Sequence, residues 1–310
     1  MEKFKEFVID QCLEWLEQKE DVALVTLVRA DGSSPRRLGS QVAVAGSGES
    51  VGSITGGCAE SAIAELALEA IGKGENKLVR FGEGSPYLDI KLPCGSSIDV
   101  FIEVGLERPD FARITDQRAQ RKPCYMAFDL AKISSQVTEN KIESDYQLCY
   151  QATTRIVIAG NGPIVPALVS LCQLLEYEVI ISSSDPETLD RIDNVRAKWN
   201  LIKSGPLDQV VYDGLTALCT VFHDHEWEPE LLKQALNSDA FYVGALGSQR
   251  THEQRKRLLA SLDIEPSQIE RIRAPIGLDL EANGPHEIAV AIIAELIESR
   301  NQMKPLKHGD

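Results

Sequence analysis

The sequence has 310 residues, of which 43% are hydrophobic, which is typical of a globular protein of roughly two domains with a buried core. Lysine and arginine number 32 against 47 acidic residues, so the net charge is −15 and non-specific binding to nucleic acid or to an anionic membrane is disfavoured. A phosphate group could bind only where basic residues gather locally.

Neither a targeting segment nor a disulfide framework is indicated. Glu2, Glu6 and Asp10 interrupt the apolar residues of the N-terminus, which is unlike a signal peptide, and no apolar run approaches the roughly 20 residues of a membrane span. The seven cysteines are an odd, scattered set without a CxxC pair. We therefore expect reduced thiols and a cytoplasmic protein.

The first half of the chain predicts mixed helices and strands. Apolar residues recur at helical spacing over 4–16, which predicts an amphipathic helix. The next predicted elements are strands at 22–28, 41–45 and 51–54, the last two forming a hairpin around residues 46–48, a helix from 59 to Gly72, and strands at 77–81 and 98–103.

After residue 107 the pattern weakens. Residues 108–122 are polar, 123–130 predict one more strand, and 131–153 predict a linker or an edge hairpin. We place a domain boundary near residue 150.

The stretch from Asp31 to Glu65 carries the first candidate site. Cys58 directly precedes the predicted helix, where unpaired backbone N–H groups and the helix dipole favour a bound anion and lower the pKa of a thiol. Gly56 and Gly57 would let a ligand approach the backbone closely. The alternative is a tight turn beside a buried structural cysteine.

Two further motifs could serve the same site. Ser34, Arg36 and Arg37 lie in an expected loop between strands, and guanidinium groups suit phosphate, although a solvated arginine pair is the alternative. Cys94 lies in an LPCG turn, from which it could approach Cys58 or have no role beyond the turn.

The second half opens with the pattern of a Rossmann-like parallel sheet. A strand, a GNG turn at 160–162, a helix and a second strand ending at Ser183 form a βαβ unit. The dinucleotide fingerprint is incomplete, because Val165 replaces its third glycine and the acidic residue comes late, at Asp185. NAD(P) binding is therefore not expected.

Polar residues also follow the later strands. An apolar strand at 217–222 ends in HDHE, and if it continued through this turn, His223 and His225 would point to one side. A half-built metal site and end-of-strand hydrogen bonding are the two alternatives. The next strand ends in a second candidate anion-binding turn, formed by Gly247, Ser248 and Arg250.

The helix starts of this half carry cap signals. Thr251 with Gln254 predicts a capping box, and the last helix is predicted to begin at Pro285 with Glu287 in its first turn.

Several blocks occur in one order along the chain: GSSPRRLG, GSITGGCAES, LPCG, HDHE, YVGALGSQRT and APIGLDLEANGPHEIAVAIIAEL. Together they resemble the XdhC/CoxI family, whose members are accessory proteins of molybdenum hydroxylases such as xanthine dehydrogenase. The resemblance covers nearly the whole chain and implies an α/β fold, with an XdhC/CoxI-type domain and linker over 1–150 and a Rossmann-like parallel-sheet domain over 151–310. The chain departs from the family in its first glycine turn, GNGPIV, and at the end of the second Rossmann strand.

The resemblance implies a maturation chaperone without turnover of its own. Such a protein would bind the molybdenum cofactor, as molybdopterin or its dinucleotide form, protect it, help to sulfurate it and deliver it to an apo molybdenum hydroxylase. Further expected partners are a cysteine desulfurase and a second copy of the chain, but neither nucleic acid nor a membrane. The alternatives are an NAD(P)-dependent oxidoreductase and a scaffold that only docks the apo-enzyme.

Molybdopterin carries a phosphate and a soft dithiolene-bound metal, so a carrier needs N–H groups, arginines and a thiolate. We therefore expect Cys58 to contact the metal, and the carboxyl edge of the Rossmann-like domain to face the cofactor. The candidate cofactor-binding residues are Ser34, Arg36, Arg37, Gly56, Gly57, Cys58, Cys94, Gly160, Gly162, His223, Gly247, Ser248 and Arg250.

Overall fold

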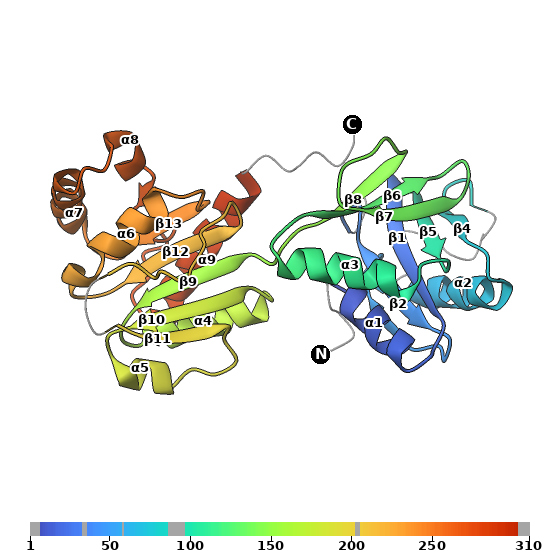
Figure 1. The fold of residues 1–310 in the computed structure, drawn as a ribbon, viewed down its shortest axis with the longest axis horizontal. Helices are drawn as coiled ribbons and strands as arrows, with labels where there is room; N and C mark the ends of the chain where they lie inside the picture. The colour runs from blue at the N-terminus through green and yellow to red at the C-terminus, as the bar shows by residue number, and fades with distance from the viewer. Residues whose placement is uncertain (1–6, 33–35, 58, 86–96, 202–204, 303–310) are drawn as a thin grey trace. The chain divides into compact units, whose positions relative to one another are not determined.

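The computed structural model describes residues 7–32, 36–57, 59–85, 97–201 and 205–302. The chain divides into two compact units, the first ending at Ala152 and the second beginning at Thr153 (Figure 1). Both units contain helices and strands, which confirms the predicted α/β class. Within the described ranges, no helix is both long enough and apolar enough to cross a membrane.

A five-stranded antiparallel sheet forms the centre of the first unit. Its middle strand is β1 (Val22–Asp31), whose first seven residues are all buried because both faces of the sheet are covered. The other strands are β2 (Gln41–Ala45), β3 (Ser50–Gly52), β4 (Lys77–Gly82) and β5 (Ser97–Glu103), and the order is β3-β2-β1-β5-β4.

Helices and a second sheet cover the two faces. The helix α2 (Glu60–Lys73) packs on one face through Ile63, Ala67 and Ala70. The other face is covered by α1 (Ile9–Glu17), α3 (Arg108–Ala119) and a smaller antiparallel sheet of order β7-β6-β8, made of β6 (Cys124–Asp129), β7 (Ser134–Thr138) and β8 (Tyr146–Tyr150). The apolar residues of α2 form one core against the sheet, and those of α1, α3 and the small sheet form another. The unit therefore has a core on each side of β1.

The first unit differs from the sequence prediction in three places. The helix α2 ends at Lys73, because Gly74 adopts the left-handed conformation (φ 65°) that closes it, and not at Gly72. The polar segment 108–122 forms α3, since Glu107 and Asp110 cap each other's N–H groups. Of the two alternatives for residues 131–153, the linker is wrong, because the segment contains the edge strands β7 and β8, which both pair with β6.

A six-stranded parallel sheet forms the second unit. Counted from its first strand, the order is 3-2-1-4-5-6, which is that of a Rossmann fold and confirms the prediction. The strands are β9 (Arg155–Gly160), β10 (Glu178–Ser183), β11 (Ala197–Asn200), β12 (Thr216–Val221), β13 (Tyr242–Ala245) and β14 (Ile272–Arg273). The strand order reverses between β9 and β12, where open α/β sheets have their ligand crevice.

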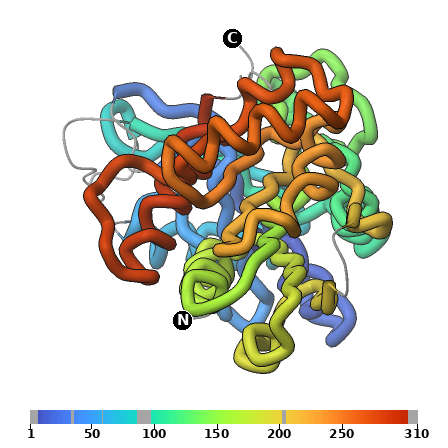
Figure 2. The backbone as a smooth tube through the Cα atoms, turned by 90° about the vertical axis from the view of Figure 1, so that its left-hand side faces the viewer, coloured from blue at the N-terminus to red at the C-terminus, as the bar shows by residue number. Residues whose placement is uncertain are grey.

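Helices cover both faces of this sheet. On one face, α4 (Ile164–Leu174) packs with α9 (Pro285–Gln302), and on the other face α6 (Pro229–Leu236) packs with α7 (Gln249–Ser261). Figures 1 and 2 show α4 (yellow-green) and α7 (orange-red) on opposite sides of the unit. The short helices are α5 (Pro186–Asp190), η3 (His225–Trp227) and α8 (Pro266–Ile269).

The predicted cap of the last helix is confirmed, and that of α7 is wrong. The helix α9 begins at Pro285, and Glu287 accepts a hydrogen bond from the Asn283 N–H (3.0 Å). The cap of α7 is Ser248, whose hydroxyl accepts the N–H of Thr251 (3.2 Å). A serine placed one residue before the helix can reach this donor, whereas Thr251 already lies inside it.

Candidate functional site

The three motif segments of the first unit are attached to one end of its large sheet. There β1 ends, β2 begins, β3 ends, β4 ends and β5 begins, as shown by the residue pairs Thr26–Gln41, Val42–Gly52, Asp31–Ser97 and Gly82–Ser97. The segments 32–40, 53–59 and 83–96 therefore all join the sheet toward the same end, although β2 begins opposite Thr26 and not opposite Asp31, and β3 and β4 are the two edge strands. Ser34, Cys58 and Cys94 lie outside the described residues.

The arginine segment is held against the small sheet. Gly39, two residues after Arg37, has φ 87°, and a Cβ atom there would lie 2.6 Å from Leu148 Cδ1 on β8. A glycine is thus needed for this close approach. Arg37 is exposed, and Arg36 is half-buried. The segment presents at least one guanidinium group to solvent.

The carboxylate of Glu60 organises the segment 53–59. Its Oε1 atom accepts hydrogen bonds from the Ser53 hydroxyl (2.9 Å) and from the N–H groups of Ile54 (3.2 Å) and Thr55 (2.8 Å). Its Oε2 atom accepts from the Thr55 hydroxyl (2.5 Å) and from the N–H groups of Gly57 (2.8 Å) and Ala59 (3.2 Å). The loop is wrapped around one side chain of the chain itself.

The prediction of unpaired N–H groups beside Cys58 is therefore wrong for Gly57 and Ala59, because Glu60 already takes both donors. The Gly56 N–H also has a partner, the Ser53 hydroxyl, at 3.1 Å. Sequence reasoning missed Glu60. The signal for its role was an acidic residue in the first turn of a helix, directly after a glycine turn. An anion at this loop would have to be held mainly by side chains.

The hydrogen bonds also change the chemistry of Glu60. Burial of the carboxyl raises its pKa, but hydrogen bonds from the Thr55 hydroxyl, the Thr55 N–H and the Ser53 hydroxyl outweigh this effect and lower the pKa of Glu60 to about 2. The side chain is thus a fixed negative charge at the start of α2. It opposes the effect of the helix dipole on a neighbouring thiol.

Gly56 and Gly57 remain suited to close contact with a ligand. Both are exposed, both have positive φ angles (75° and 115°), and a Cβ atom on either would meet none of the described residues within 4 Å. The positive φ angles explain why both residues are glycines.

A charged cluster stands at the same end of the sheet. Arg80 on β4 donates to Asp31 (2.6 Å), to Asp99 (3.1 Å) and to Ser97, and Arg29 lies 3.5 Å from Asp99. The hydrogen bond from Arg80 lowers the pKa of Asp31. The cluster ties β1, β4 and β5 together at the end of the sheet that carries the motif segments. Sequence reasoning missed it because the partners are distant along the chain.

In the second unit, the glycine turn after β9 has internal partners. A Cβ atom on Gly160 would lie 2.4 Å from Val221 Cγ2, so the glycine there permits the close pairing of β9 with β12. Gly162 has φ 80° with open space beyond it, but its N–H donates to the Thr188 hydroxyl (3.0 Å). In a dinucleotide site, the N–H groups of this turn face a pyrophosphate.

The position where a ribose would bind is also filled by internal hydrogen bonds. The side-chain oxygen of Asn161, Oδ1, accepts from the Ser183 hydroxyl (2.7 Å), and its side-chain nitrogen, Nδ2, donates to the Ser184 hydroxyl (2.8 Å). Asp185 caps α5 by accepting from Glu187 and Thr188. Asp185, the acidic residue that comes late for a dinucleotide fingerprint, is thus the N-cap of α5.

The other predicted residues of this edge lie near one another without forming a metal site. The strand does not continue through HDHE, because β12 ends at Val221 and His225 begins η3, so His223 and His225 are not on one strand face. His223 and Arg250 are exposed, and a Cβ atom on Gly247 would lie 3.4 Å from His225 Cε1. Among the residues that the structure describes, no three His, Cys, Asp or Glu side chains are placed to hold a metal ion.

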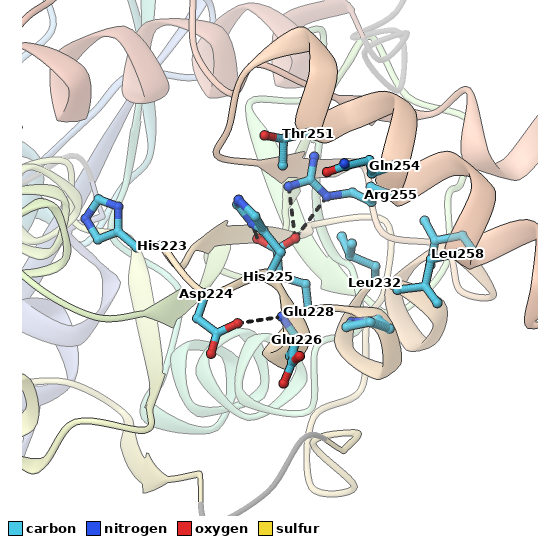
Figure 3. Close-up of a pocket in the computed structure, with 12 residues that line it drawn as sticks. His223, Asp224, His225, Glu226, Glu228, Leu232, Thr251, Gln254, Arg255 and Leu258 are labelled. Carbon is cyan, nitrogen blue, oxygen red and sulfur yellow. Dashed lines mark hydrogen bonds and ion pairs between the residues drawn. The ribbon is translucent and has the colours of Figure 1, made fainter.

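A buried ion pair lies beside this edge (Figure 3). Glu228, 1% exposed, accepts from Arg255 Nε (2.9 Å) through Oε2 and contacts His225 Nδ1 (3.2 Å) through Oε1. These side chains line a cavity of about 350 Å³ between η3, α6 and α7. Sequence reasoning found the HDHE turn but missed Glu228 and Arg255, because nothing in the sequence shows that they meet.

Comparisons with known proteins agree along the chain. Residues 156–296 match the model described as the XdhC Rossmann domain, and residues 15–82 match the model of the XdhC and CoxI family. The chain is 30% identical to a protein of Escherichia coli K12 named molybdenum cofactor insertion chaperone PaoD, over 93% of this chain and 86% of that one. It is 24% identical to a Bacillus subtilis protein described as a probable xanthine dehydrogenase component, over 93% and 96% of the two chains.

A solved structure supports the same conclusion for the fold. A crystal structure described as a xanthine dehydrogenase from Bacillus halodurans is similar with a TM-score of 0.79 at 20% identity, over 96% of both chains. The two halves of the sequence thus match models of one family, and the fold is similar to that of the solved structure. The chain belongs to the XdhC/CoxI family.

Proposed function

We propose that this protein binds the molybdenum cofactor, protects it and delivers it to an apo hydroxylase of the xanthine dehydrogenase type. The observation that carries the proposal is the 30% identity to a molybdenum cofactor insertion chaperone across nearly the full length of both chains. The end of the large sheet to which the three motif segments are attached is the part of the first unit that best suits this role.

Each part of this end has a role in the proposal. Arg36 and Arg37 bind the phosphate of the cofactor, Ser34 adds a hydroxyl, and the exposed surface of Gly56 and Gly57 lies against the pterin. Cys58 contacts molybdenum or carries sulfur, and Cys94 is the second candidate thiol. Because Glu60 occupies the loop N–H groups, the arginine side chains supply most of the attraction for the phosphate.

The second unit takes part through its carboxyl edge. Gly160 is buried against Val221 and is left out, and we include Gly162, His223, Gly247, Ser248 and Arg250 as residues that contact the cofactor during transfer. Sulfuration with the help of a cysteine desulfurase, and association of two copies of the chain, complete the proposal.

The function is tested by purifying the full chain from a host that makes molybdopterin and by assaying the bound pterin and molybdenum. The loaded protein is then mixed with an apo hydroxylase, and the recovery of hydroxylase activity is measured. Bound cofactor with recovery of activity supports the proposal. A cofactor-free protein that still binds the hydroxylase favours a scaffold, and a cofactor-free protein without such binding contradicts both.

The oxidoreductase alternative receives less support from the geometry. The Rossmann strand order is present, but the Gly162 N–H donates to Thr188 and Asn161 bridges the ends of β9 and β10. A dinucleotide would have to break these hydrogen bonds before it could bind.

A further inference from the structure

The cavity between η3, α6 and α7 combines apolar walls with charged groups at its opening. Its volume is about 350 Å³, and its apolar walls are formed by Pro229, Leu232, Leu258 and Leu259. Leu258 is 45% exposed, so the apolar lining continues out to the surface of α7. A pocket of this kind can bury the apolar part of one side chain of a partner protein.

The charged groups of the lining are mainly negative. The carboxylates of Asp224, Glu226 and Glu228 stand against one guanidinium, that of Arg255, so three negative charges and one positive charge leave −2 apart from the histidines. Asp224 and Glu226 are exposed, and the Glu226 carboxylate has no hydrogen bond or ion pair with any described residue. The opening therefore attracts a cation and repels a phosphate or a carboxylate.

Arg255 brings a donor without a partner to the same cavity. The residue is 6% exposed, its Nε atom donates to Glu228 and its Nη2 atom donates to the Leu246 carbonyl oxygen (2.7 Å). Its Nη1 atom is buried and has no hydrogen-bond partner within the described part of the chain. Figure 3 shows this end of the guanidinium directed toward Thr251 and Gln254, which also line the cavity. A buried donor without a partner is unfavourable, so an acceptor oxygen here would be stabilising.

His225 supplies an acceptor between these groups. Its Nδ1 atom lies 3.2 Å from Glu228 Oε1, and a carboxylate only accepts, so in the neutral ring Nδ1 carries the hydrogen and Nε2 keeps its lone pair. The lining thus offers one donor and one acceptor, which are the groups that pair with the C=O and the N–H of a peptide main chain.

The requirements of the cavity are met together by a basic residue within a polypeptide. Arginine and lysine carry a cationic head on an apolar stem, and their main chain adds the carbonyl oxygen that Arg255 lacks. A free organic cation would leave Arg255 Nη1 without an acceptor. An apolar side chain would leave Asp224 and Glu226 without a counter-charge.

We propose that this cavity is a docking site for an arginine or lysine residue in an extended segment of a partner polypeptide. Figure 3 shows Arg255 on the α7 side of the cavity and Asp224 and Glu226 on the η3 side. The main-chain carbonyl of the partner accepts from Arg255 Nη1, its stem packs against the leucines, and its head faces the two carboxylates. The proposal rests on the second unit alone and does not depend on the proposed function of the first.

The test is an NMR titration of the full chain with Nα-acetylarginine N-methylamide, which carries the head, the stem and the main-chain carbonyl groups. For a ligand of about 16 non-hydrogen atoms we expect a dissociation constant on the order of 0.1–1 millimolar. The citrulline analogue has the same shape without the charge, and butylguanidine has the charge and the stem without a carbonyl. Each should bind about tenfold more weakly.

Two pairs of matched variants locate the binding. Leu258→Trp fills the cavity from its exposed wall and should abolish binding, whereas Leu174→Trp, at an exposed leucine of α4 outside the cavity, should leave binding unchanged. Glu226→Gln removes one negative charge from the opening and should narrow the difference between the arginine and citrulline compounds. Glu298→Gln, at an exposed position of α9, should leave that difference unchanged.

Three results would overturn the proposal. The first is no detectable binding of the arginine compound up to about 10 millimolar, and the second is equal binding by Leu258→Trp and the unchanged protein. The third is equal binding of the arginine compound and either analogue: equality with citrulline would show that the charge has no role, and equality with butylguanidine would identify a site for free organic cations.

Discussion

Glu60 is a single residue whose side chain sets the conformation of a whole loop. It accepts six hydrogen bonds, from Ser53, Ile54, Thr55 twice, Gly57 and Ala59. The carboxylate holds the Gly57 N–H directly, and it holds Gly56 through the Ser53 hydroxyl, which accepts the Gly56 N–H and donates to Glu60.

Replacement of Glu60 by glutamine should destabilise the first unit. Glutamine keeps the shape, but its amide nitrogen cannot accept the bonds now made to one oxygen, so we expect the free energy of unfolding to fall by about 1–3 kcal/mol. Urea denaturation measures the change, and Glu65→Gln, at an exposed position of the same helix, is the control. Equal stability of the two variants would show that the loop does not depend on the carboxylate.

The same carboxylate predicts a pH dependence. The pKa of Glu60 falls from 4.5 to about 2 on folding, so between these values the unfolded chain binds more protons and stability rises with pH. The contribution of Glu60 is complete above about pH 4.5 and is lost as the pH falls toward about 2. The stability difference between the unchanged protein and Glu60→Gln should therefore shrink in unfolding curves recorded at decreasing pH below that value. A constant difference from neutral pH to about pH 3 would contradict the lowered pKa.

A substitution at Arg37 can distinguish an effect on cofactor binding from an effect on the stability of the fold. Its side chain is exposed, so Arg37→Ala should change stability by no more than about 0.5 kcal/mol, while cofactor binding weakens about tenfold or more. Arg36 is half-buried and engaged in a contact, which makes it a less clean test. Bound pterin and melting temperature are measured together, with Arg257→Ala on α7 as the control. A loss of stability with unchanged binding would show that Arg37 stabilises the fold and does not bind the cofactor.

At the scale of elements, the Glu228–Arg255 pair joins the start of α6 to the middle of α7. Both side chains are deeply buried, with exposed fractions of 1% and 6%, and Glu228 also contacts Thr220 on β12 at 3.4 Å. The attraction therefore acts where two helices and a strand meet, and each charge depends on the other for compensation.

Removing one partner of this pair should cost more than removing both. Glu228→Leu leaves Arg255 as an uncompensated buried charge and Arg255→Met leaves Glu228 so, and for each a loss of about 3–5 kcal/mol in the free energy of unfolding is expected. Combining Glu228→Leu with Arg255→Met removes both charges and should cost clearly less than the sum of the two single changes. Denaturation of the unchanged protein, the two single variants and the double variant gives the coupling energy between the two charges. Additive losses would mean that the charges do not interact.

At the scale of the whole molecule, the Rossmann fold and its usual ligand are separable. The strand order is complete, yet where a dinucleotide would bind, Asn161 is bonded to Ser183 and Ser184, and the Thr188 hydroxyl accepts the Gly162 N–H. The exchange of the third fingerprint glycine for the buried Val165 adds bulk at the start of α4.

We predict that calorimetry with NAD or NADP detects no binding tighter than about millimolar. A ligand would have to displace internal hydrogen bonds for contacts of similar strength, so little net free energy is gained. A crystal structure with NAD stretched from Gly160 to Asp185, or micromolar affinity, would overturn this and favour the oxidoreductase alternative.

The sequence by itself determined most of the secondary structure and the fold class. Apolar runs rich in β-branched residues identified β1, β9 and β12, and Pro285 with Glu287 identified the start of α9, because these signals act between residues close in sequence. The ordered motif blocks also pointed to the XdhC/CoxI family, which the comparisons confirm.

Only the tertiary structure decided how the polar groups pair. The side-chain partners of Arg80, of Asn161 and of Arg255 lie 17 to 49 residues away along the sequence, and composition or periodicity cannot reveal such contacts. For Glu60 the partners were near in sequence, but whether its carboxylate turned into the loop or into solvent depended on the loop's three-dimensional path. Local patterns fix the backbone, whereas the hydrogen-bond partners that control charge and ligand access are chosen by the packing of distant segments.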